Sequence, residues 1–149
     1  MISLRIKLTA GLIGLLAVSG CAHIAATKAT FTHTGSELVL QIDRHMEEIV
    51  RGPDIEEDQT LVLELRDYQI GERLEVPSAK AVARLEVRRF GPTLEGAVYT
   101  GWVRIRKATD TKIVADVKLV VTATTTTGHD VRTATFNKQY QFYRGPSGD

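Results

Sequence analysis

The stretch ADVKLVVTA, Ala115 to Ala123, decides the fold class. Apolar and polar side chains alternate through it, in the order Ala115, Asp116, Val117, Lys118, Leu119, Val121, Thr122 and Ala123, interrupted only by the apolar Val120. A period of two places successive side chains on opposite faces of a sheet. The stretch therefore predicts a strand with one buried face and one wet face.

The same alternation recurs on both sides of this stretch. Its apolar members are Leu61, Leu63 and Leu65, then Ala83, Leu85 and Val87, then Val103 and Ile105, and finally Phe136, Tyr140 and Phe142. Gly and Pro residues punctuate the runs at turn-like spacing, for example at Gly71, Pro77 and Gly91. Regular short strands of this kind predict an all-β chain, built as a single antiparallel β-sandwich of the Ig-like or a similar type over residues 31–144.

Residues 36–51 fit two patterns. With a period of 3.6, Val39, Ile42 and Met46 share a helix face, and the spacing of Thr34 and Glu37 matches a capping box. With a period of two, Leu38, Leu40 and Ile42 form a strand after a turn at Gly35. The strand is favoured because the rest of the chain is β. A helix here would make the class α+β.

The chain opens with Arg5 and Lys7, followed by an apolar run from Leu8 to Val18. This order is typical of an export signal, and the run is shorter than the roughly 20 residues that a membrane-spanning helix needs. It ends in Val18-Ser19-Gly20-Cys21, which contains the only cysteine of the chain. These four residues resemble the lipobox of bacterial lipoproteins.

The resemblance implies that residues 1–20 are a signal peptide cut after Gly20, and that Cys21 carries a diacylglyceryl thioether and an acylated amino group. Several acyl chains would hold the protein to membrane lipid, because each buried methylene contributes about 0.8 kcal/mol. Ala22, which is not Asp, favours the outer membrane facing the periplasm in a Gram-negative cell. Residues 21–30 are expected to form a tether, and residues 145–149 a flexible tail.

A looser resemblance covers the hairpin pattern from Gly101 through Leu119 to Phe136, which is similar to small β-sandwich lipoproteins of unassigned activity. It supports the fold only. Without Arg5 and Lys7, the 19 basic residues become 17 against 18 acidic ones, which gives a net charge of −1. This balance gives no electrostatic reason to expect nucleic acid as a partner.

No catalytic constellation is evident. The serines lack a Gly-x-Ser-x-Gly setting, and His33, His45 and His129 lie in polar segments typical of solvated histidines. An acidic run after Pro53 is a weak candidate for calcium, with the oxygens of Asp54, Glu56, Glu57 and Asp58. Its spacing differs from that of an EF-hand. No cofactor is implied.

The outward positions of the predicted strands carry a possible ligand face made of Trp102, Arg104, Arg106, Arg84 and Arg88. Such a patch could bind phosphate, sulfate or carboxylate groups. The competing interpretation is a wet face with cross-strand ion pairs to Glu64, Glu86 and Asp116.

The sequence thus favours a lipid-anchored envelope protein without enzymatic activity, acting in structure, assembly or binding, with an envelope protein or polysaccharide as a possible partner. One alternative is a periplasmic hydrolase or calcium-dependent enzyme that uses the acidic residues 54–58. Another is a carrier that holds an apolar ligand between sheets.

Overall fold

The computed structural model describes residues 22–48, 55–89, 94–125 and 131–146. Within these ranges the chain forms strands and no helix, so the expected all-β class is confirmed. In chain order the strands are β1 (Ala22–Thr34), β2 (Glu37–Glu48), β3 (Ile55–Leu65), β4 (Arg73–Val76), β5 (Ala81–Arg89), β6 (Leu94–Ala108), β7 (Lys112–Thr125) and β8 (Val131–Arg144).

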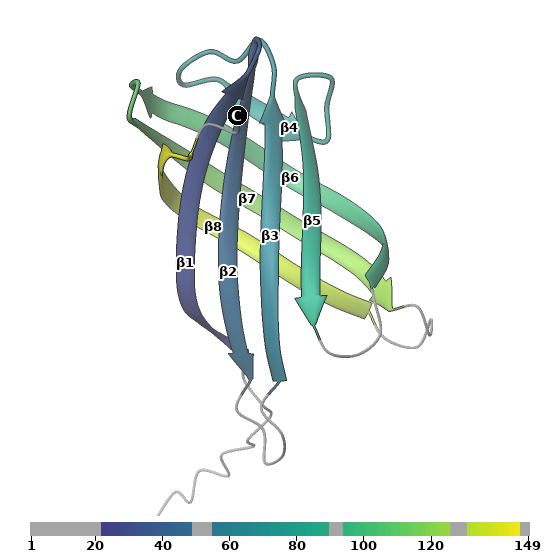
Figure 1. Cartoon of the computed structure of the whole chain (residues 1–149). Coiled ribbons are helices and arrows are strands. Elements are labelled where there is room, and N and C mark those ends of the chain that lie inside the picture. Colours follow the sequence, from purple (N-terminus) through teal and green to yellow (C-terminus); the bar gives the residue numbers. More distant parts are fainter. Residues whose placement is uncertain (1–21, 49–54, 90–93, 126–130, 147–149) are drawn as a thin grey trace, which may run out of the picture.

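The strands form one mixed sheet that curves round on itself (Figure 1). Its order is β4-β6-β7-β8-β1-β2-β3-β5, and neighbouring strands are antiparallel except β1 and β8, which are parallel. In Figure 1, β1, β2, β3 and β5 make one wall, and β6, β7 and β8 cross behind them. A short turn joins the two outermost strands of the sheet, β4 and β5, so the sheet nearly closes into a barrel.

The structure therefore differs from the expected antiparallel sandwich. The two walls are continuous through the contact of β1 with β8, where Thr30 pairs with Tyr143 and Phe31 with Arg144. The backbone N–H of Gly145 extends this contact by donating to the carbonyl of Phe31 at 2.9 Å. Alternation in a sequence identifies the faces of each strand but not its neighbours, so it did not reveal this closure.

Residues 37–48 form β2, so the helix considered for residues 36–51 is wrong over this range. The side chains of Leu38, Leu40 and Ile42 are fully buried, as the period of two requires. β2 pairs with β1 on one side and with β3 on the other along nearly its whole length. Two complete ladders satisfy the backbone and override the local capping pattern.

The core lies inside the curved sheet and is formed by the alternating rows that the sequence predicts. Its largest fully buried side chains, each under 2% exposed, are Phe31, Phe136, Phe142, Leu38, Leu40, Ile42, Leu61, Leu63, Leu65, Ile105, Ile113 and Leu119. The predicted row in β7, from Ala115 to Ala123, is also buried. Burial of this apolar surface is the main stabilising contribution to the fold.

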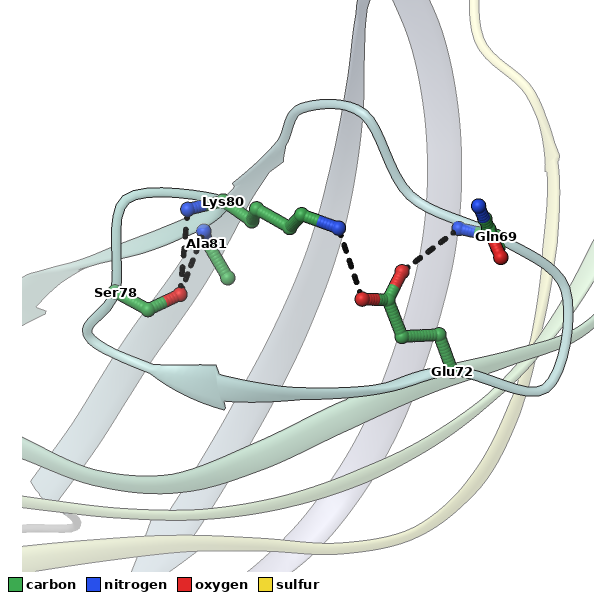
Figure 2. A network of polar contacts seen from close by, with 5 residues as sticks. All are labelled: Gln69, Glu72, Ser78, Lys80 and Ala81. Carbon is green, nitrogen blue, oxygen red and sulfur yellow. Dashed lines mark hydrogen bonds and ion pairs between the residues drawn. The ribbon is translucent and has the colours of Figure 1, made fainter.

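Polar contacts fasten the loops next to β4, as Figure 2 shows. The Lys80 ammonium contacts the Glu72 carboxylate at 2.9 Å, and the other oxygen of that carboxylate accepts the Gln69 N–H at 3.1 Å. The Ser78 hydroxyl accepts the N–H groups of Lys80 and Ala81. The hydrogen bond from Lys80 lowers the pKa of Glu72. These contacts join the loop before β4 to the turn after it.

The described structure reaches into both segments that the sequence predicts to be a tether and a tail. β1 begins at Ala22, within the predicted tether, and Gly145 at the start of the predicted tail is buried. The signal segment, Gly20, Cys21 and residues 147–149 lie outside the described residues. Among the described residues, no helix has the length and apolar character required to cross a membrane.

Candidate functional site

Trp102 lies on the outer face of β6 between two arginines. The guanidinium carbons of Arg73 on β4 and Arg104 on β6 are 5.0 and 5.4 Å from the centre of its ring. These distances allow cation–π attraction. Trp102 is half-buried, so it is less available for recognition than an exposed tryptophan would be.

The charges around Trp102 are largely compensated by their neighbours. Arg73 pairs with Glu75 at 2.7 Å, and Arg106 pairs with Asp116 across the β6–β7 ladder. Asp116 also accepts a hydrogen bond from Gln139 on β8 at 3.0 Å. The hydrogen bonds from Gln139 and Arg106 lower the pKa of Asp116, while partial burial opposes them. This surface agrees with the predicted cross-strand pairing for Asp116.

The structure does not join all five residues of the predicted ligand face in one ladder. Arg84 and Arg88 lie on β5, which pairs with β3, whereas β6 pairs with β4 and β7. Arg84 is 3.3 Å from Glu86 on its own strand. The side-chain nitrogen Nε of Arg104 is buried and makes no hydrogen bond within the described part of the chain.

Arg88 instead borders a polar hollow on the outer face of the other wall. In the ladder it faces Asp58 on β3, and Asp58 faces His45 on β2. The ring nitrogen Nδ1 of His45 lies 2.7 Å from a carboxylate oxygen of Asp58. Next to this pair, the Thr60 hydroxyl donates to Asp43 at 2.8 Å. The hollow has a volume of about 400 Å³.

A carboxylate that contacts a ring nitrogen can orient the imidazole for proton transfer, so this hollow is the strongest acid–base candidate among the residues that the structure describes. The Thr60 hydroxyl, which lines the hollow, is directed to Asp43. In the sequence, His45 and Asp58 lie in separate segments, and their pairing was not predicted. Extending the alternation of β3 back from Leu61 would place Asp58 outward, but only the register with β2 brings His45 to it.

The acidic candidate at residues 54–58 is mostly strand. β3 begins at Ile55, and alternation sends Glu57 and Asp58 to opposite faces. Glu57 accepts a hydrogen bond from Gln59 at 2.7 Å, while Asp58 contacts His45. Asp54 and the side chain of Glu56 lie outside what the structure describes. In the described part of the chain, no group of three or more His, Cys, Asp or Glu side chains could hold a metal ion.

Of the other two histidine candidates, the structure describes only His33, which lies apart from this pair. His33 is exposed near the end of β1, with its ring edge-on to Phe31 at 5.9 Å between centroids. His129 lies outside the described residues.

Arg44 is an internal cation that the sequence analysis did not identify. It continues the inward row of Leu38, Leu40 and Ile42 on β2, and only 5% of it is exposed. Its guanidinium nitrogens donate to the Gln59 side-chain oxygen at 2.6 Å and to the Thr135 carbonyl of β8 at 2.8 Å.

The guanidinium of Arg44 also lies 3.5 Å from the centre of the Phe136 ring. Burial disfavours the charged form of each group, so it lowers the pKa of Arg44 and raises the pKa of Tyr140. The positive charge of Arg44 opposes the rise at Tyr140. Arg44 on β2 therefore contacts Thr135 and Phe136 on β8 across the interior of the sheet.

A groove runs between β1 and β8 where these strands separate. It has a volume of about 490 Å³ and lies between residues 27–30 of β1 and residues 138–146 of β8 and the segment after it. Its charged lining residues are Lys28, Lys138 and Arg144, all cationic. Tyr140 and Tyr143 supply aromatic surface.

Comparison with family models, curated proteins and solved structures gives no match to this chain.

Proposed function

We propose that this chain is a lipid-anchored protein of the bacterial envelope whose β domain binds a partner and catalyses no reaction. The observation that carries the anchor is the sequence Val18-Ser19-Gly20-Cys21 placed directly before β1, which begins at Ala22. An acylated Cys21 would leave little slack between the lipid and the sheet. The end of the sheet at which β1 begins would then face the membrane.

Two of the exposed apolar side chains fit this orientation, while Ile70 and Val82, in the loop before β4 and on β5, are exposed to a similar degree. Ile24, near the start of β1, is 46% exposed, and Val131, at the start of β8, is 66% exposed. Both strands begin at the same end of the molecule (Figure 1). Apolar side chains at that end could insert at the boundary between the lipid headgroups and the acyl chains. Ala22 favours the periplasmic face of the outer membrane in a Gram-negative cell.

A binding role fits the surface better than the two alternatives. Glu57 and Asp58 lie on opposite faces of β3, so they do not form one acidic site. The interior is occupied by Phe31, Phe136 and Phe142, each at most 1% exposed, which leaves less support for an apolar carrier. The open groove between β1 and β8 has the features of a docking surface.

The anchor is tested by intact-mass analysis of the protein purified from membranes. The expected mass corresponds to cleavage after Gly20 plus the acyl groups on Cys21, and the full chain with Cys21→Ser should stay uncut and lose its labelling by radioactive fatty acid. A Thr109→Ser chain serves as the matched control because Thr109 lies in the β6–β7 turn. A free thiol or an intact leader on the unaltered protein would overturn the proposal.

A further inference from the structure

We propose that the groove between β1 and β8 binds an extended acidic segment of a partner protein, which adds to the sheet as a further strand. The inference rests on the proposed binding role and names the partner class. It does not depend on the lipid anchor.

The backbone of both strands is available along this groove. β1 pairs with β2 from Ala22 to Thr34, but with β8 only at Thr30 and Phe31. β8 pairs with β7 from Val131 to Tyr143, but with β1 only at Tyr143 and Arg144. Long sheet edges with unpaired N–H and C=O groups are templates for an added strand.

The contact of Arg44 with β8 shows that this edge accepts donors other than a neighbouring strand. The carbonyl of Thr135, within the stretch of β8 that β1 does not pair, receives a guanidinium N–H of Arg44 at 2.8 Å. Closer along β8 to its contact with β1, the groove opens beside Lys138 and Tyr140. A peptide backbone could bind the free groups there in the same manner.

The charge of the groove selects the partner. Lys28, Lys138 and Arg144 line it together with polar and aromatic groups, and no acidic side chain does so among the described residues. None of these three cations forms an ion pair in the part of the chain that the structure describes. Lys28 faces Asp43 in the ladder, but that carboxylate is engaged by Gln41 and Thr60.

Three uncompensated cations beside two open strand edges thus favour a segment that alternates acidic side chains with small or β-branched ones. The acidic groups would contact the cations, and the backbone would pair with β1 or β8. Lys138, which lies 4.8 Å from the Tyr140 ring centre, would move between that ring and the incoming carboxylate.

The test uses the full chain in detergent and a fluorescent peptide that alternates Thr and Glu. We expect saturable binding that Lys28→Glu with Lys138→Glu weakens by about tenfold or more. The matched control, Lys107→Glu with Lys118→Glu, reverses two exposed lysines on β6 and β7 and should leave binding unchanged. Hydrogen exchange should show new protection at residues 22–30 and 138–142 when the peptide is bound.

Three further arms make the outcome decisive. A peptide of equal charge with proline at alternate positions lacks the N–H groups that a ladder needs, so equal binding of this peptide would overturn strand addition. Vesicles containing phosphatidylglycerol that bind through Lys28 and Lys138, while the peptide does not bind, would assign the groove to lipid headgroups instead. Cys21→Ser should bind the peptide normally, which separates this inference from the anchor.

Discussion

The two sides of β1 hold their neighbours in different ways. Toward β2, an antiparallel ladder runs from Ala22 to Thr34, with one irregularity after Ile24. Toward β8, the ladder stops after Thr30 and Phe31, and beyond it a side chain, Arg44, connects the walls. The same strand therefore borders both the fully paired part of the sheet, termed the sealed wall, and the largely unpaired boundary between β1 and β8, termed the open seam.

This difference separates stability from function. Complete ladders such as β6–β7 fix the backbone, and substitutions there act mainly on the free energy of unfolding. The open seam leaves strand edges unpaired, and this is where the proposed partner segment would bind. Substitutions in the two regions should differ accordingly.

The largest effect is expected in the sealed wall, at Gly101 of β6. Its φ of +149° disfavours other residues, and a Cβ there would lie 1.9 Å from the carbonyl oxygen of Lys118. Gly101→Ala should lower the free energy of unfolding by about 3 kcal/mol or more, because it adds backbone strain to a backbone clash. Urea denaturation of the purified chain measures the loss.

Gly71→Ala is the matched control for Gly101→Ala. Gly71 also has a positive φ, of +84°, but an added Cβ meets nothing within 4 Å. Only strain remains, so the expected loss is about 1 kcal/mol. Equal losses in the two variants would show that the close approach of β6 and β7 does not limit the residue at position 101.

A smaller effect is expected at the seam from Arg44→Ala. The change leaves the Gln59 side-chain oxygen and the Thr135 carbonyl without their buried donor and opens a cavity beside Phe136. We expect a loss of about 2 kcal/mol in the free energy of unfolding, measured by urea denaturation. Arg84→Ala, at an exposed arginine on β5, should change it by less than about 0.5 kcal/mol.

Arg44→Met distinguishes the hydrogen bonds of Arg44 from its volume. Met fills much of the same space but donates nothing, so it should remain less stable than the unaltered chain. Replacing buried charged side chains by apolar ones of similar volume sometimes raises the free energy of unfolding. Such a gain here would contradict the assignment of Arg44 as the bridge between β2 and β8.

The sealed wall and the seam also differ in how far sequence alone predicts them. The inward rows, such as Leu61, Leu63 and Leu65, were predicted correctly because a period of two is a local property of the chain. Arg44 occupies the next inward position after Ile42, but a charged residue in an apolar row interrupts the pattern used to find it. Its burial depends on Gln59 and Thr135, which are distant in sequence.

The candidate sites depend on register even more strongly. His45 meets Asp58 only because β2 pairs with β3 in one particular alignment, and nothing local to either residue fixes that alignment. The groove exists because the first and last strands meet in parallel at Thr30 and Tyr143. The outward placement of Trp102 and Arg104 could be predicted because both lie on β6 and alternation is a property of one strand. The placement of Arg84 and Arg88 beside them was wrong because it depends on which strands pair, and ligand binding there stays a prediction.

The smallest effect is expected on the surface of the sealed wall, at Asp116. Hydrogen bonds from Gln139 and Arg106 lower its pKa in the folded chain. Asp116→Asn should therefore cost about 0.5–1 kcal/mol at neutral pH, the range of a partly exposed ion pair. Asp110→Asn, in the exposed β6–β7 turn, is the control and should cost nothing measurable.

The pH dependence of this cost identifies its origin. Because the folded pKa of Asp116 lies below the unfolded value of about 3.9, the contribution is complete above that value and is lost as pH falls through the folded pKa. Urea denaturation should give a constant difference between the unaltered chain and Asp116→Asn from about pH 5 to 7, which shrinks in acid as the pH falls through the folded pKa. A difference that persists in acid would mean that the substitution disturbs the packing of β7, and that the carboxylate charge adds nothing to this wall.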